Sequence, residues 1–207
     1  GFMRRLDFTR SDAQVRFSPR PRRGGVFGRR VRKFYYIGTL NYFQTGTGRL
    51  ESRDFNGEFR TEFQTSDSLS VQYFKNYDFL EAPFQIATGV RLPVGPYDWQ
   101  QGQISYTAGT QRRISGTTTF AAGSYYNGTQ RTLGYRGRIA PSVHLSLEPT
   151  LSFNWLDLKQ GAFTTKLVGT RVTAPTPVTI TAMAKTRART SLMMRMRRSS
   201  YRLSRVS

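Results

Sequence analysis

The sequence of 207 residues contains no cysteine and a single histidine, His144. Without cysteine, neither a disulfide framework nor a thiolate metal site can form. One histidine excludes a multi-histidine metal centre. His144 falls on the polar side of a predicted strand, and we interpret it as a lumen or turn residue rather than as a catalytic base. We therefore expect no metal and no cofactor.

Long apolar runs are absent as well. No stretch of about 18 apolar residues occurs, so the sequence predicts no transmembrane helix. No signal peptide is recognisable, and the opening "GFMRRLDFTR" starts within a pattern, without an initiator Met at residue 1. We therefore interpret the chain as a fragment of a longer protein.

Acidic residues are scarce, with 12 Asp and Glu against 32 Lys and Arg and a formal net charge of +20. Residues 1–33 carry 11 basic and 2 acidic groups, and residues 178–207 carry 8 basic groups and no acidic group. Residues 34–177 carry 13 basic and 10 acidic groups and are nearly neutral. The charge thus indicates an anionic partner for the ends of the chain and not for its middle.

What the sequence does contain is a regular alternation. From Val143 to Trp155 the odd-numbered positions are apolar and the even-numbered positions are polar. Because successive side chains of a β-strand point to opposite faces, this segment predicts a strand with one apolar and one polar face. Its length of 13 residues exceeds that of an ordinary strand and suits a strand that crosses a bilayer.

Similar alternation recurs along the chain, and no helical periodicity competes with it over 34–173. The predicted strands are 34–44, 54–64, 69–77, 99–111, 114–125, 129–139, 143–155 and 162–173, with further candidates at 13–18 and 178–184. Short connections at 65–68, 112–113, 140–142 and 174–177 alternate with longer or glycine-rich ones at 45–48, 78–98, 127–128 and 156–161. Asn127-Gly128 itself predicts a tight hairpin turn.

This arrangement predicts an all-β fold, an antiparallel up-and-down transmembrane β-barrel of which about 8 to 10 strands are visible. The predicted lumen-lining residues are Asp54, Glu58, Arg60, Glu62, Gln103, Gln111, Arg136, Arg138, Glu148 and Asn154. The predicted lipid-facing residues are Phe55, Phe59, Phe63, Leu145, Leu147, Leu151 and Phe153. Aromatic residues near strand ends predict a girdle at the water–lipid boundary, formed by Tyr42, Trp99, Tyr125 and Trp155.

Catalysis is not expected from these residues. Glu58 and Glu62 share a face, but Arg60 lies between them in the alternation and would neutralise both. Glycosidase chemistry requires one carboxyl group that an apolar pocket keeps protonated. A wet face with arginine does not provide such a pocket, so we predict that the chain is not an enzyme.

Four segments, "RFSPRPR" (16–22), "GRLESRDFNGEF" (48–59), "SYTAGTQRRISG" (105–116) and residues 145–173, resemble an uncharacterised bacterial β-barrel domain family. In longer members this domain follows a signal peptide and a carbohydrate-binding module similar to family 9 modules. The resemblance covers roughly residues 1–173. It implies a barrel in the outer membrane of a Gram-negative-type bacterium, in contact with lipid, that handles carbohydrate or lies beside it. The module that would contact carbohydrate is not in this chain.

The end of the chain departs from the family pattern. We expect residues 1–177 to be a fragment of one barrel domain, with a basic connection at about 19–33, and residues 178–207 to be a basic tail. On a helix, four apolar residues of the tail would share a face and could meet anionic lipid or nucleic acid. The composition is also typical of a gene read out of frame, and we expect the tail to be out of frame or disordered.

One alternative is a soluble basic β-protein that binds nucleic acid. It would bind phosphate through the basic tail and through Arg20, Arg22, Arg23, Arg29 and Arg30, and would stack bases on exposed rings such as Tyr35 and Tyr42. A nucleic-acid groove would place Arg and Lys along the strand faces, whereas the central strands are nearly neutral. We therefore favour a membrane barrel that acts as a passive pore or as an anchor, and do not expect nucleic acid as a partner.

Overall fold

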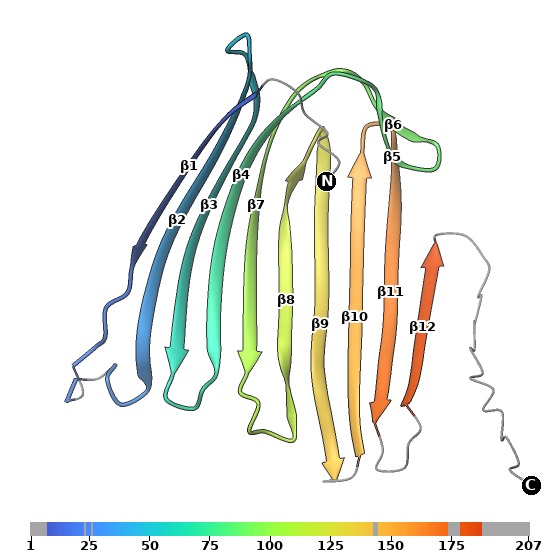
Figure 1. The fold of residues 1–207 in the computed structure, drawn as a ribbon. Helices are drawn as coiled ribbons and strands as arrows, with labels where there is room; N and C mark the ends of the chain where they lie inside the picture. The colour runs from blue at the N-terminus through green and yellow to red at the C-terminus, as the bar shows by residue number, and fades with distance from the viewer. Residues whose placement is uncertain (1–7, 23, 26, 143–144, 174–178, 188–207) are drawn as a thin grey trace, which may run out of the picture.

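A computed structural model describes residues 8–22, 24–25, 27–142, 145–173 and 179–187 (Figure 1). Strands dominate this part of the chain, and none of it forms a helix long and apolar enough to cross a membrane. The strands are β1 (Phe8–Phe17), β2 (Val31–Thr45), β3 (Leu50–Phe63), β4 (Ser68–Leu80), β5 (Phe84–Ala87), β6 (Val90–Leu92), β7 (Gly95–Ala108), β8 (Ile114–Tyr125), β9 (Gly128–Ser142), β10 (Leu145–Leu158), β11 (Gly161–Thr173) and β12 (Thr179–Arg187).

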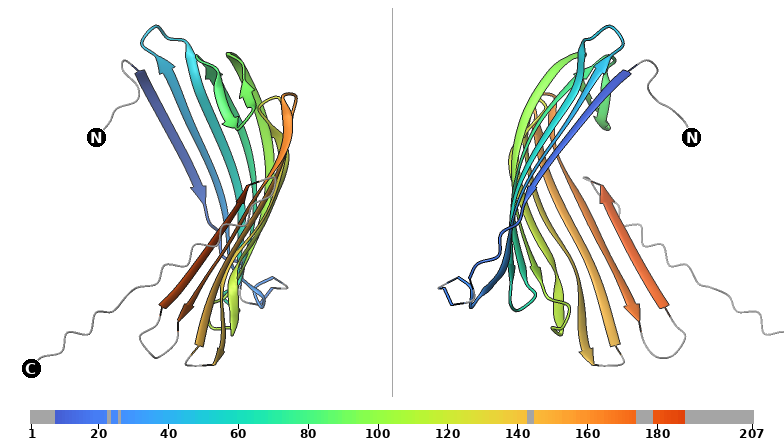
Figure 2. Two further views of the ribbon diagram at one scale, coloured as in Figure 1. Left: turned by 90° about the vertical axis from the view of Figure 1, so that its right-hand side faces the viewer. Right: turned by 60° about the vertical axis from the view of Figure 1, so that its left-hand side comes forward.

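Ten strands form one antiparallel sheet in the order β1-β2-β3-β4-β7-β8-β9-β10-β11-β12. Each strand pairs with the next along the chain, except that the β5–β6 hairpin is inserted between β4 and β7 and pairs only with itself. The predicted all-β, antiparallel, up-and-down arrangement is thereby confirmed. The sheet is curved (Figure 2) but not closed, because β1 and β12 stand at opposite ends of the strand order.

The β5–β6 hairpin lies on the concave side of the sheet in both views of Figure 2. Leu92 of β6 is fully buried, with 0% of its surface exposed. A Cβ atom added to Gly161, at the start of β11, would lie 3.4 Å from Cγ2 of Val90 in the hairpin. The hairpin therefore covers the face of the sheet toward which that Cβ would point, and this face is the concave one.

All of the predicted strands are present, and most are longer than predicted. β10 continues past Trp155 to Leu158. The predicted strand ended at Trp155 because the alternation changes there: Leu156 and Leu158 are apolar at even positions, and both are buried. These two residues lie on the face that the hairpin covers, so an apolar side chain is favourable there. The hairpin itself was not predicted, because strands of 3 and 4 residues are too short to show a period.

The connections alternate between the two ends of the sheet, but the predicted sorting by length was wrong. At the upper end in Figure 1, the β8–β9 and β10–β11 connections consist of residues 126–127 and 159–160 only. At the lower end, the β1–β2 connection runs through 18–30. The reason is that strands include residues predicted as loops: 140–142 belong to β9 and 156–158 to β10.

The predicted candidate strand at 178–184, which is also the start of the predicted basic tail, overlaps residues 179–187. They form β12, which pairs with β11 from Thr165↔Arg187 to Thr173↔Thr179. The predicted connection at 174–177 and the remainder of the tail, 188–207, lie outside the described residues.

The β8–β9 turn is displaced by one residue from the predicted Asn127-Gly128 turn. Its central residues are Tyr126 and Asn127, and Tyr126 has a φ of 49°, in the left-handed region that non-glycine residues seldom occupy. Gly128 is instead the first residue of β9. A Cβ atom there would lie 2.0 Å from the carbonyl oxygen of Asp157. Glycine is therefore required by the close approach of β10 rather than by turn geometry.

We expect Gly128→Ala to lower the free energy of unfolding by about 1–3 kcal/mol, because the backbone of β10 must move to admit a methyl group. Gly38→Ala in β2 is the matched control, since the added Cβ has no described residue within 4 Å apart from Gly38 and its two chain neighbours. It should leave the stability unchanged or raise it by up to about 1 kcal/mol. Denaturant unfolding followed by tryptophan fluorescence would measure both, and equal effects of the two substitutions would contradict this role of Gly128.

Candidate functional site

The strand register aligns apolar side chains into one continuous row across eight of the ten strands, which ends where Phe153 of β10 pairs with Lys166 of β11. Directly paired neighbours, from β1 to β10, are Phe17, Tyr36, Phe59, Val71, Ile104, Phe120, Leu133 and Phe153. Directly paired residues point to the same face of a sheet. We call the face that carries this row the apolar face; its rows on both sides add Leu40, Phe55, Tyr73 and Tyr106.

The apolar face is open rather than packed within the described residues. Val71, Ile104 and Phe120, near the middle of the row, are 43%, 51% and 49% exposed. A contiguous apolar surface of this kind is typical of an interaction site, because its exposure to water is unfavourable. The predicted lipid-facing residues all belong to it: Phe55, Phe59 and Phe63 from β3, and Leu145, Leu147, Leu151 and Phe153 from β10.

Polar side chains limit the apolar face toward the upper end. Arg53 on β3, Lys75 on β4 and Gln100 on β7 are the first long polar side chains there. On β10 the apolar stretch from Leu145 to Trp155 extends about 34 Å along the strand, at roughly 3.4 Å per residue. In a sheet tilted by about 40° this corresponds to a height of about 26 Å, close to the roughly 25 Å apolar band of membrane barrels.

The opposite face is polar and its side chains form hydrogen bonds sideways between strands. Ser70 Oγ donates to Glu58 Oε1 (2.9 Å), and Gln103 Nε2 donates to Gln72 Oε1 (3.2 Å). Nine predicted lumen-lining residues lie on this face: Asp54, Glu58, Arg60, Glu62, Gln103, Arg136, Arg138, Glu148 and Asn154. The strand pairing places these residues on the same face of the sheet as Gly161. The polar face is therefore the concave one that the hairpin partly covers.

Gln111 departs from the lumen-lining prediction. β7 ends at Ala108, so Gln111 belongs to the β7–β8 turn at the lower end of the sheet. Its side-chain Nε2 donates to the carbonyl oxygen of Thr65 in the neighbouring β3–β4 turn.

Tyr35 is the centre of a charged cluster that sequence reasoning missed. Tyr35 is only 7% exposed although it lies on the polar face. The guanidinium of Arg60, Nζ of Lys33 and the guanidinium of Arg16 lie 4.5, 4.6 and 5.1 Å from the ring centroid, and its hydroxyl donates to Glu62 Oε1 at 2.8 Å. Cation–π contacts and an ion-pair ladder therefore link β1, β2 and β3. No pattern within a single strand could have indicated it.

The four rings predicted as a girdle do not share a face. Tyr42 and Trp155 lie on the apolar face, whereas Trp99 and Tyr125 lie on the polar face. Trp99 stacks on Tyr126 with ring centroids 4.5 Å apart, and Tyr125 meets Tyr126 edge-on at 4.9 Å. Burial raises the pKa of Tyr126 to about 12, and the charges of Tyr125, Asp78 and Tyr97 act in the same direction.

The residues of the nucleic-acid alternative are not assembled into one surface. Arg20, Arg22, Arg29 and Arg30 are exposed in the β1–β2 connection, while Tyr35 and Tyr42 point to opposite faces of β2. Arg23 and His144 lie outside the described residues. No group of three or more His, Asp or Glu side chains in the described part of the chain is placed to hold a metal ion.

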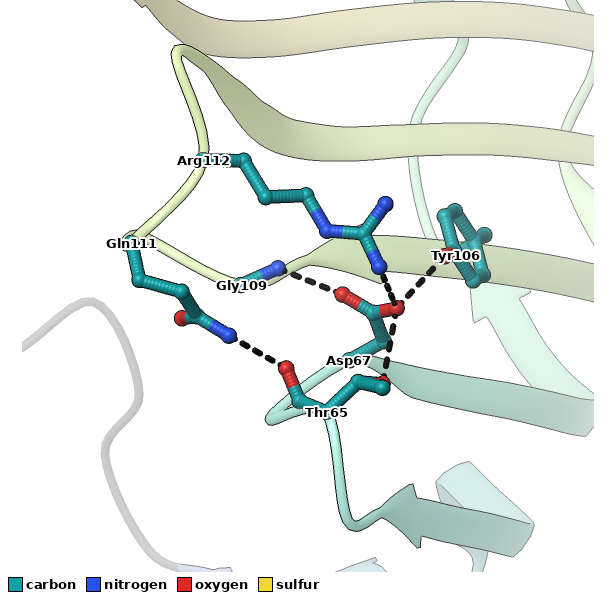
Figure 3. A network of polar contacts seen from close by, with 6 residues as sticks. All are labelled: Thr65, Asp67, Tyr106, Gly109, Gln111 and Arg112. Atoms are coloured by element: carbon teal, nitrogen blue, oxygen red, sulfur yellow. Dashed lines mark hydrogen bonds and ion pairs between the residues drawn. The ribbon is translucent and has the colours of Figure 1, made fainter. Parts of the chain in front are cut away.

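Asp67 joins two neighbouring turns at the lower end of the sheet (Figure 3). Its carboxylate is buried and accepts hydrogen bonds from the Gly109 backbone N–H (2.8 Å), the Thr65 hydroxyl (3.0 Å) and the Tyr106 hydroxyl (3.0 Å). Arg112 completes the set with an ion pair. The Gly109 hydrogen bond above all, with Thr65, Tyr106 and Arg112, lowers the pKa of Asp67 against the opposing effect of burial. The network fixes the β3–β4 turn against the β7–β8 turn.

No family model, curated protein or solved structure matches this chain. The resemblance to a β-barrel domain family therefore remains a prediction.

The Asp67 network predicts a specific pH dependence of stability. Because the folded-state pKa of Asp67 lies below its ordinary value of 3.8, the stability it confers is fully present above that pH and is lost as the pH falls through the folded pKa. Asp67→Asn should therefore lower the free energy of unfolding at neutral pH, and the difference from the unmodified chain should shrink under acid conditions. Denaturant titrations at a series of pH values would measure it.

The control is Asp157→Asn, since the Asp157 carboxylate is exposed and forms no ion pair or hydrogen bond with the described residues. It should leave the neutral-pH stability close to that of the unmodified chain. A loss as large as that of Asp67→Asn would contradict the role of the turn network.

Proposed function

We propose that this sheet is part of the wall of a transmembrane β-barrel, with its apolar face toward lipid and its concave polar face toward a water-filled lumen. The observation that carries the proposal is the apolar row from Phe17 to Phe153, which stays in register across eight strands and is exposed at seven of its eight positions. A soluble sheet would cover such a row with a second layer. No second layer covers it within the described residues, and lipid would do so without further protein.

The orientation of the faces supports the same proposal. A barrel is formed when a sheet curls until its edge strands pair, and the side chains on the concave face then become the interior. The concave face here carries the polar ladder. Closure requires partners for the free edges of β1 and β12, either each other or further strands of the same protein. Only then is every backbone group satisfied within lipid.

The proposed role is passive. Side chains such as Gln72, Gln103 and Asn154 would line a hydrated interior, and the β5–β6 hairpin would narrow it at the upper end. The barrel would act as a pore or as an anchor for a neighbouring module. The hydroxyl and amide groups of the polar face suit hydrogen bonding to carbohydrate, as the resemblance implies. An outer membrane of a Gram-negative-type bacterium is the compartment in which barrels of this kind are found.

We propose no catalytic activity for the polar face. Glu58 accepts a hydrogen bond from Ser70 and lies 3.8 Å from Arg60 Nε, while Glu62 accepts one from Tyr35. Both carboxylates are thus engaged in the ladder. Neither is enclosed in an apolar pocket that would hold its proton for acid catalysis.

Phe120→Arg tests the orientation of the faces. Phe120 lies in the middle of the apolar row, so a charge there should cost about 2–4 kcal/mol in a bilayer and reduce the fraction of chain that folds into phosphatidylcholine vesicles. Thr119→Arg is the matched control on the polar face of the same strand. It loses one hydroxyl contact with Ser105 and should cost about 1 kcal/mol or less.

Flotation of vesicles, combined with protease protection, would measure the inserted fraction. Equal insertion of the two variants would contradict the proposal that the apolar face meets lipid.

A further inference from the structure

The polar face has a hollow near its lower end, and a passive lumen wall does not require one. It has a volume of about 640 Å³ and is lined by residues of β7 to β11. Arg136 and Arg138 enter from β9, Glu148 and Thr150 from β10, and Arg171 from β11. Three arginines and one glutamate give this lining a surplus of positive charge.

Two of the three arginines have structural partners. Arg138 Nε donates to Ser146 Oγ at 2.9 Å, and Arg171 Nη1 lies 3.6 Å from Glu148 Oε2. Arg136 has no hydrogen bond or ion pair with any described side chain and is exposed in the hollow. Its five N–H donors are therefore available to a ligand.

The surroundings of Arg136 leave space for such a ligand. Arg136 pairs with Thr117 on one side and with Thr150 on the other, so a threonine stands beside it on each neighbouring strand of the polar face. The next position in this row is Gly169, which has no side chain to fill the hollow. Leu167 forms an apolar part of the wall. Arg136 is thus a cationic residue between two threonine positions, at the wall of an open space.

We infer that this hollow binds a small solute through an oxyanion, a carboxylate or phosphate group, held by Arg136 and assisted by Arg138. A guanidinium presents parallel N–H donors that match two oxygens of such a group. Arg136 and Arg138 also stand two residues apart on one face, so their charges repel, and an anion between them relieves that repulsion. The inference rests on the proposed function in that it requires the polar face to be open to water.

The test uses the full chain folded in detergent micelles, with inorganic phosphate as the probe. The line width of the phosphate signal in ³¹P NMR, followed during titration, reports binding. Arg136→Gln should weaken binding about tenfold, which corresponds to one charge-assisted contact. Arg131→Gln is the matched control: Arg131 is an exposed arginine of the same strand, but it pairs with Trp155 and points to the opposite face. It removes the same charge and should leave the dissociation constant unchanged.

Equal affinity of the two variants would overturn the inference, because phosphate would then respond only to total charge. If Arg136→Gln does not fold, Arg136→Lys serves in its place: it keeps the charge but loses the fork, and it should bind more weakly than the unmodified chain. Failure of the chain to insert into vesicles, with the two variants still differing in phosphate binding, would reject the membrane barrel and leave the anion site standing. Insertion without any difference between the variants would reject the site alone.

Discussion

The structure depends on one constraint: the two-residue alternation of each strand must stay in register with that of its neighbours. Because directly paired residues share a face, a slip of one residue in any strand would move its apolar side chains among the polar ones. The pairing of Tyr36 with Phe59, and of Phe120 with Leu133, shows this register held along the sheet. Both the continuous apolar face and the hydrogen-bonded polar face follow from it.

The sequence was sufficient for the parts of the molecule that this alternation governs. It indicated the long strands, and it separated Phe55 and Phe59 from Glu58 and Arg60 correctly, because neighbouring residues in a strand must point apart. Prediction from the sequence failed where contacts with another part of the chain interrupt the alternation. At the end of β10, the hairpin covers the otherwise polar face, and the apolar side chain of Leu156 is buried there.

Contacts between strands could not be predicted from the sequence pattern of a single strand. The cations around Tyr35 come from β1, β2 and β3, and the donors to Asp67 come from its own turn, from the β7–β8 turn and from the end of β7. The same holds for the hollow around Arg136, whose walls combine five strands. Arg136 could be assigned to the polar face from sequence, but only the placement of the neighbouring strands shows that it has no side-chain partner among the described residues.

In a membrane wall, the apolar face of the sheet would meet lipid and the polar face would meet water. Since the chain has no cysteine, a single introduced cysteine can carry a nitroxide label at each position from 103 to 106 of β7 in turn. In phosphatidylcholine vesicles, labels at Ile104 and Tyr106 should collide preferentially with oxygen, and labels at Gln103 and Ser105 with a water-soluble nickel complex. An alternation with a period of two residues is the result expected for a membrane wall. Equal access of the nickel complex to all four positions would contradict it.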